Sequence, residues 1–136
     1  MSAVDRRAQL LRVARTTFAR AGYHATSMND VTDAAGVTKP VLYQHFASKR
    51  DLFHALLDDV GNQMLEAFTR ATAVASDGRE QTRQGFRAYF RWVAENRDAF
   101  QLLFGGAARQ NDDFASAVRK FTGASAQAIA PLIAAG

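Results

Sequence analysis

Apolar side chains recur at the spacing of an α-helix along most of the chain. In the first stretch, Leu11, Ala14, Phe18 and Ala21 stand at i, i+3, i+7 and i+10, which places them on one helical face. Gly22 comes next, and glycine commonly follows the last residue of a helix. The pattern therefore predicts a first helix that ends just before Gly22 and buries this face.

Two short helices are predicted next, each with its own start signal. Ser27 can cap a helix whose first turn carries Asp30, close to the exposed backbone amides, and Gly36 ends that helix. Thr38 can cap another helix, with Pro40 in the first turn, where proline loses no helical hydrogen bond. We therefore expect a pair of short helices joined by a tight turn.

The remaining helices are longer. Ser48 begins a Ser-x-x-acid start signal, and apolar residues then keep helical spacing as far as Phe68. After an interruption at residues 76–78, another helix is predicted, with an inner face formed by Phe86, Tyr89, Phe90 and Val93. Two more helices follow, around residues 100–104 and from residue 111 onward. No run of alternating β-branched residues predicts a strand, so we predict an all-α protein of about seven helices.

Composition narrows the classes of protein. The chain has 136 residues, of which 48% are hydrophobic, and it contains no cysteine. This hydrophobic share is enough for a buried core, and the lack of cysteine excludes disulfides and thiolate metal sites. No apolar run reaches the ~18 residues of a membrane span, and no apolar signal segment stands at the N-terminus. We therefore expect a cytoplasmic protein that makes no membrane contact.

Positive charge is concentrated at the start of the chain. Residues 1–50 hold eight Lys and Arg against three Asp and Glu, whereas residues 51–136 hold nine against ten. A net charge of +5 on one unit suits a surface that meets a polyanion, most simply nucleic acid. The change of sign coincides with the change from short to long helices, which predicts two units, residues 1–49 and 50–136.

Residues 27–46 have the spacing of a helix-turn-helix motif. Packing of the two helices on the first one leaves Lys39, Val41, Gln44 and His45 on the outer side of the second motif helix. In a major groove, glutamine can pair with adenine, lysine can donate to guanine, and valine can touch a thymine methyl group. The hydroxyl and ammonium groups around the motif can instead meet phosphates.

Residues 31–52 strongly resemble the N-terminal region of TetR-family transcriptional regulators. The resemblance rests on Leu42-Tyr43-x-His45-Phe46, followed by Ser-Lys and then by an acid and Leu52. The first helix also ends as in this family, at Gly22-Tyr23 with Thr26-Ser27 just after. The close match covers roughly residues 8–57.

The resemblance implies a homodimer that binds an inverted-repeat DNA operator, usually as a repressor, and that a small molecule releases. It implies base-reading positions at Lys39, Pro40, Val41 and Gln44. It implies phosphate-contacting positions at Thr26, Ser27, Tyr43, His45 and Lys49. Residues 1–49 would then be the DNA-binding domain, and residues 50–136 an effector-binding and dimerisation domain. Members of the family usually continue for two more helices, which build the dimer interface. We therefore expect this second domain to be incomplete or, alternatively, the dimer to be built from the helices present.

The second half of the chain is rich in aromatic residues. Most of them suit a packed core, but helical bundles also hold ligands in apolar cavities. The candidate pocket residues are Met64, Phe68, Phe86, Tyr89, Phe90, Trp92, Val93, Phe104 and Phe121. They predict an elongated hydrophobic effector, for which a fatty-acyl species is one candidate. Four arginines spaced four residues apart, from Arg79 to Arg91, suit a solvated helix face or, alternatively, an anionic head group.

Enzyme motifs are missing from the sequence. His24, His45 and His54 form no HExxH pair, and no Gly-x-Ser-x-Gly elbow or phosphate-binding loop occurs. We therefore predict no catalytic residues, no metal site and no cofactor. The alternative to a ligand-responsive DNA-binding regulator is a helical module that binds a small molecule or a protein and does not read DNA.

Overall fold

The computed structural model describes residues 2–73, 77–106 and 110–120, and these residues are mostly helical. The helices are α1 (Ala3–Ala21), α2 (Met28–Ala35), α3 (Lys39–His45), α4 (Lys49–Ala73), α5 (Gly78–Glu95) and α6 (Arg97–Phe104). Residues 112–120 form a further helical segment. No β-strand occurs in the described part of the chain, and the predicted all-α fold is confirmed.

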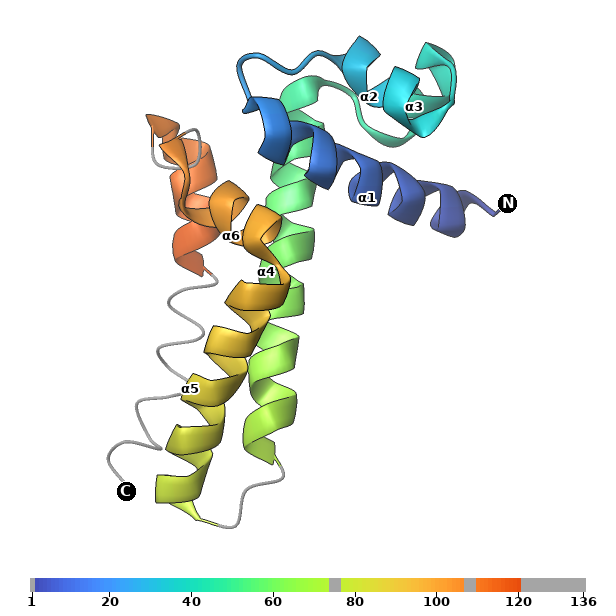
Figure 1. The fold of residues 1–136 in the computed structure, drawn as a ribbon. Helices are drawn as coiled ribbons and strands as arrows, with labels where there is room; N and C mark the ends of the chain where they lie inside the picture. Colours follow the sequence, from blue (N-terminus) through green and yellow to red (C-terminus); the bar gives the residue numbers. More distant parts are fainter. Residues whose placement is uncertain (1, 74–76, 107–109, 121–136) are drawn as a thin grey trace.

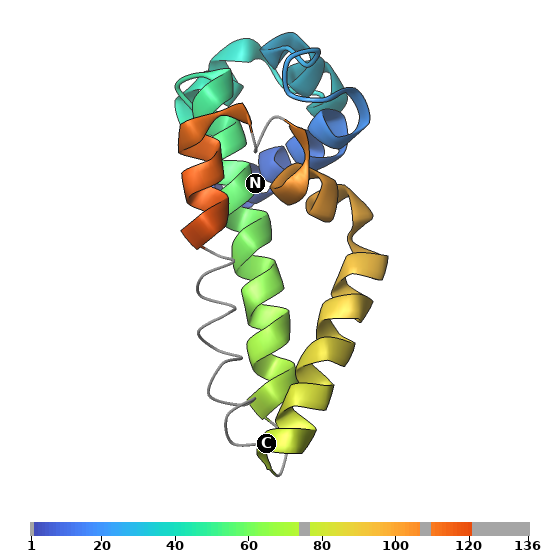
Figure 2. The same cartoon turned by 90° about the vertical axis from the view of Figure 1, so that its left-hand side faces the viewer.

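The long helix α4 runs from one end of the molecule to the other. At its N-terminal end, α1, α2 and α3 form one lobe, and at the other end α5 lies beside it (Figure 1). Helix α6 returns the chain from α5 to α1, and the segment 112–120 lies along the upper part of α4 (Figure 2). The N-terminal lobe therefore touches the rest of the protein through α4, α6 and this last segment.

The predicted start and stop signals of α2 are confirmed. The Ser27 hydroxyl accepts a hydrogen bond from the Asp30 amide (3.1 Å), and the Asp30 carboxylate accepts one from the Ser27 amide (2.8 Å). This reciprocal pair satisfies two amides that the helix itself leaves free. Gly36 has a φ of 68° and a ψ of 33°, a left-handed conformation that favours glycine. These local signals fix where α2 begins and where the chain turns.

Aromatic rings join the N-terminal lobe to the last segment. The ring centroids of Phe18 and Phe53 are 5.1 Å apart, and those of Phe53 and Phe114 are 4.7 Å apart. All three side chains are almost fully buried. Tyr23 lies against each of them. The core therefore runs without interruption from α1 through the first turns of α4 to residues 112–120.

The predicted inner face of α5 is only partly confirmed, because Val93 packs against the core and Tyr89 is half-buried, but the two phenylalanines are not buried. Phe86 and Phe90 are 48% and 67% exposed, whereas Gly85 and Trp92 are buried against the neighbouring helices. The packed side of α5 therefore includes Trp92 and Gly85, and the main contact of α5 is with α4. Ala21, predicted to be buried, is exposed because it lies in the last turn of α1.

Candidate nucleic-acid interface

Helices α2 and α3 are held as one unit by buried apolar side chains. Val31 and Leu42 are fully buried, and Phe46, at the end of α3, is 4% exposed. They share the core with the buried face of α1. Within the turn, the Val37 amide donates to the Thr32 carbonyl (3.1 Å). The helix-turn-helix unit therefore has its inner side fixed, which determines the side of α3 that faces solvent.

The outer side of α3 carries the predicted base-reading residues. Lys39, Pro40 and Gln44 are exposed, and Val41 is half-buried. Lys39 and Pro40 occupy the first turn and Gln44 lies one turn later, so the exposed residues share one surface. Thr38 begins the helix with extended backbone but without a side-chain cap hydrogen bond. The structure thus places Lys39, Pro40 and Gln44 on one exposed surface of α3.

The residues predicted to contact phosphates fall into two groups. Ser27, Tyr43 and His45 are exposed or half-buried around the same end of the molecule. Thr26 is 1% exposed, and its hydroxyl donates to the Gly22 carbonyl (2.7 Å). Contrary to the sequence-based expectation, Thr26 is therefore not an exposed phosphate ligand in this structure. Its hydroxyl instead ties the start of α2 to the end of α1.

Lys49 is held in place by Tyr23. Its ammonium donates to the Tyr23 carbonyl (2.9 Å) and lies 4.3 Å from the centre of the tyrosine ring. An ammonium has three donors, so this contact leaves others for a phosphate oxygen. The positioning role of Tyr23 was missed by sequence reasoning, because residues 26 apart give no periodic signal.

Other cations around the motif contact the protein itself. Arg50 forms an ion pair with Asp113 and lies 5.5 Å from the centre of the Phe114 ring. Arg7 lies over the ring of Phe46, at 5.2 Å from its centre. These arginines cover aromatic side chains at the edge of the lobe. Arg7 and Arg50 therefore take part in contacts within the protein as well as adding to the net positive charge of residues 1–50.

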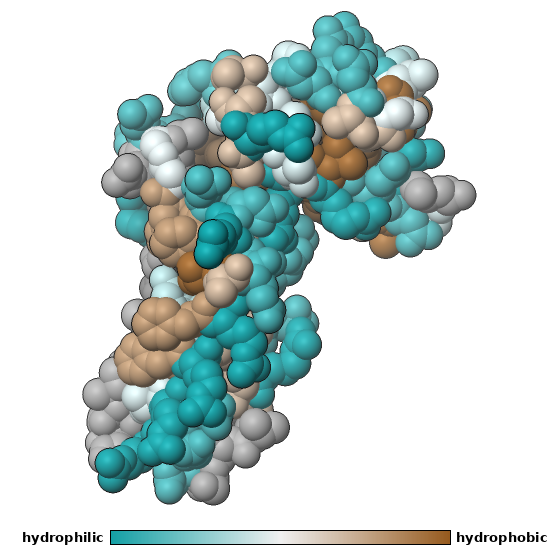
Figure 3. Space-filling model, in the orientation of Figure 1, coloured by the Kyte–Doolittle hydropathy of each residue, from teal (hydrophilic) through white to brown (hydrophobic). Residues whose placement is uncertain are grey.

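The candidate effector residues do not gather in one cavity. Met64, Phe68 and Trp92 are buried, whereas Phe86 and Phe90 are exposed. The remaining described members, Tyr89, Val93 and Phe104, are half-buried, and Phe121 lies outside the described residues. A hollow of about 310 Å³ between α4 and α5 includes Trp92 but none of the other candidates. Apolar side chains gather on the surface over α5 and α6, beside a hydrophilic stripe (Figure 3).

Comparisons with a family model and with a solved structure identify the family of this chain. The family model described as bacterial regulatory proteins, tetR family, matches residues 10–56, from α1 to the second turn of α4. A solved transcriptional regulator of the TetR/AcrR family from Thermobifida fusca is 30% identical. Its TM-score is 0.73, and the match covers 97% of this chain and 70% of that one. The chain belongs to the TetR family.

Two relatives in this family have names that state a regulatory role. The HTH-type transcriptional activator FasR of Mycolicibacterium smegmatis is 34% identical over 95% of this chain. The HTH-type transcriptional repressor KstR2 of the same species is 31% identical over 80% of it. The chain spans 59% of the length of FasR and 53% of that of KstR2. The TetR-family likeness thus extends beyond the helix-turn-helix unit into α4–α6.

The described residues contain no group of three or more His, Cys, Asp and Glu side chains that can hold a metal ion. None of their helices combines the length and the apolar character that crossing a membrane requires.

Proposed function

We propose that this TetR-family chain is a sequence-specific DNA-binding transcriptional regulator with α3 as its recognition helix. The observation that carries the proposal is the division of α3 into two sides. Leu42 and Phe46 anchor one side in the core, and Lys39, Pro40 and Gln44 stand exposed on the other. A short helix held in this way can enter a major groove with its N-terminal residues on base edges.

Each exposed side chain of α3 suits a particular part of a base pair. The Gln44 amide can donate to and accept from adenine, and the Lys39 ammonium can donate to guanine. Val41 and Pro40 offer apolar contact to a thymine methyl group. Ser27, Tyr43, His45 and Lys49 would hold the phosphates on either side and set the register of the helix.

The proposed assembly is a homodimer that acts in the cytoplasm on an inverted-repeat operator. Two recognition helices in successive major grooves would lie ~34–36 Å apart. A small hydrophobic effector bound among α4, α5 and α6 would alter DNA binding. Repression stays a prediction, because one relative is named as an activator and the other as a repressor.

A selection experiment tests the proposal. The chain is incubated with a pool of random duplexes, and the retained duplexes are sequenced after several rounds. We expect an inverted repeat to emerge. Gln44→Ala should then weaken binding to the selected duplex by about tenfold or more and binding to random duplex much less, since a bidentate base contact contributes ~1–3 kcal/mol.

The control is Gln101→Ala, which removes an exposed glutamine from α6, far from the motif in sequence. It should leave both affinities unchanged. Equal losses on both duplexes for Gln44→Ala would remove its base-reading role. If the pool yields no preferred sequence and random duplex does not bind, the alternative holds, namely a helical module that binds a small molecule or a protein.

A further inference from the structure

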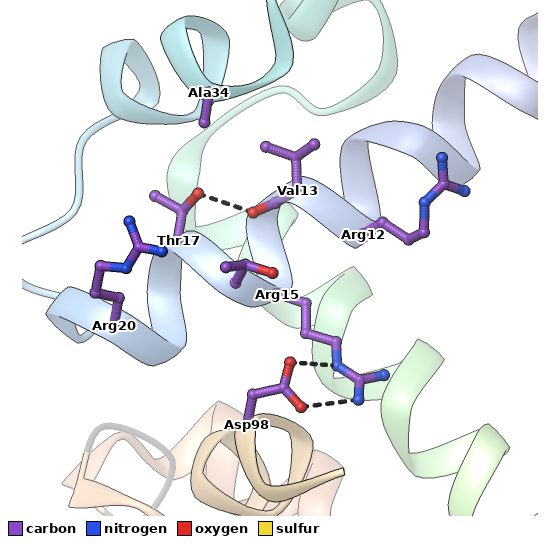
Figure 4. A pocket seen from close by; sticks show the side chains of 8 residues that line it. Arg12, Val13, Arg15, Thr17, Arg20, Ala34 and Asp98 are labelled. Carbon is purple, nitrogen blue, oxygen red and sulfur yellow. Dashed lines mark hydrogen bonds and ion pairs between the residues drawn. The ribbon is translucent and has the colours of Figure 1, made fainter. Parts of the chain in front are cut away.

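A single arginine joins the N-terminal lobe to the helices that follow it. The guanidinium of Arg15 on α1 donates from Nε and Nη2 to the two carboxylate oxygens of Asp98 on α6, both at 2.8 Å (Figure 4). Its Nη2 also donates to the Asn96 side-chain oxygen (2.7 Å), and its Nη1 donates to Gln63 on α4 (3.3 Å). We call these four residues the interdomain clamp.

The burial and geometry of the clamp distinguish it from an incidental surface ion pair. The Arg15 side chain is 18% exposed, and both oxygens of the Asp98 carboxylate accept hydrogen bonds in the bidentate geometry that arginine favours. Hydrogen bonding from Arg15 lowers the pKa of Asp98, so the carboxylate keeps its charge at a more acidic pH than a free aspartate does. By contrast, the ion pair Arg70–Glu66 is exposed, that of Arg83 with the half-buried Glu80 is partly exposed, and each joins residues of the same helix.

Because of its position, the clamp can affect the orientation of the recognition helix α3. Helix α3 packs on α2, and α2 packs on α1, so α1 carries the helix-turn-helix unit. Helix α1 in turn meets the second half of the molecule at α6 and α4, where Arg15 makes the bonds. A change in the angle between α1 and α6 would therefore move the unit that bears Lys39 and Gln44.

Asn96 extends the clamp toward the interior of the α4–α5 pair. It is the residue between α5 and α6, and its side-chain amide donates to the Trp92 carbonyl (2.9 Å). Trp92 is buried and lines the hollow between α4 and α5. One side chain thus bonds to Arg15 through its oxygen and to the last turn of α5 through its nitrogen.

We propose that Arg15 is the positioning residue that holds the helix-turn-helix unit in its DNA-binding orientation, and that Asn96 links it to α5. The inference rests on the proposed function for its DNA readout. The clamp itself can be tested without DNA.

The first test measures orientation directly. Because the chain has no cysteine, Ala47→Cys and Ala94→Cys supply two exposed sites, after α3 and on α5, for nitroxide labels and a pulsed-EPR distance measurement. The wild-type background should give one narrow distance distribution. Arg15→Gln should at least double its width, whereas Arg12→Gln, which removes an exposed arginine from the same helix, should not. Equal widths in all three proteins would overturn the proposal.

The second test measures DNA binding, and the direction of the change in affinity decides between two explanations. Asp98→Asn removes a negative charge, so electrostatics alone predicts tighter binding to a duplex selected by the wild-type chain. The clamp predicts binding weakened about fivefold or more, with Glu66→Gln, which breaks the Arg70 pair, unchanged. Arg15→Asp combined with Asp98→Arg should restore most of the loss.

Thermal melts separate orientation from folding. If Asp98→Asn melts close to the wild type and still binds weakly, the clamp acts on orientation as proposed. If it binds as tightly as the wild type with a narrow distance distribution, the proposal fails. If the wild-type chain binds no duplex at all, the proposed function fails, and the distance measurement still decides whether Arg15 positions the lobe.

Discussion

The two ends of α4 are packed in different ways. At the N-terminal end, α1, α6 and the segment 112–120 pack against it, and Phe18, Phe53 and Phe114 are almost fully buried. Near the other end α5 lies alongside, and its Phe86 and Phe90 stand exposed. The same residue type therefore has opposite roles at the two ends, and its role follows from the neighbours rather than from its spacing in the sequence.

The largest expected effect uses this contrast directly. Phe53→Ala should lower the free energy of unfolding by roughly 3–5 kcal/mol, because it leaves a cavity among packed rings. Phe90→Ala should change it by less than about 0.5 kcal/mol, since the side chain is mostly in solvent. Urea unfolding of the two variants and the wild type measures both. A loss above about 2 kcal/mol for Phe90→Ala would show that this side chain is covered in solution.

The N-terminal lobe was predictable because its signals are local. Ser27 with Asp30 and the left-handed Gly36 set the bounds of α2 through hydrogen bonds and backbone geometry within a few residues. The face of α5 could not be predicted in this way. Its periodicity fits a buried face with Phe86 and Phe90 or one with Gly85 and Trp92, and only contact with α4 selects the second.

In the candidate site, too, the features that depend on local spacing could be predicted, and the contacts between distant residues could not. The exposed side of α3 follows from the burial of Leu42 and Phe46, which the apolar spacing already indicates. The contact of Lys49 with Tyr23 and that of Arg15 with Asp98 join residues 26 and 83 positions apart. Such pairs depend on how the helices pack, and no sequence periodicity signals them. The resemblance to a family identified the motif but not these supporting contacts.

A smaller effect is expected at the turn of the motif. Gly36 has a φ of 68° and an added Cβ would meet no atom within 4 Å, so the cost of Gly36→Ala is in the backbone alone. We expect a loss of about 1 kcal/mol in the free energy of unfolding. Gly106→Ala is the matched control, because that glycine has equal space and no positive φ. Equal stabilities for the two variants in thermal melts would show that the turn relaxes.

The smallest effect concerns two carboxylates near Arg15. Arg15 lowers the pKa of Asp98 by hydrogen bonding, whereas burial raises the pKa of Asp59 against the opposing pull of Arg7 and Arg15. The folded state binds the Asp98 proton less tightly than the unfolded chain. Asp98 therefore adds stability above the unfolded pKa of about 4, and this stability is lost as the pH falls through the lower folded pKa. For Asp59 the sign is opposite: its contribution is present below the unfolded pKa and is lost as the pH rises through the folded pKa.

Thermal melts between pH 3 and pH 7 separate the two carboxylates. Asp98→Asn should lower stability at pH 7 and lose this effect toward pH 3, by less than about 1 kcal/mol because the carboxylate is partly exposed. Asp59→Asn should be neutral or slightly stabilising at pH 7, since it removes a charge that burial disfavours. An Asp98→Asn effect that is the same at both pH values would mean that the ion pair adds no pH-dependent stability. Arg15 would then hold α6 by hydrogen bonding alone, to Asn96 as much as to Asp98.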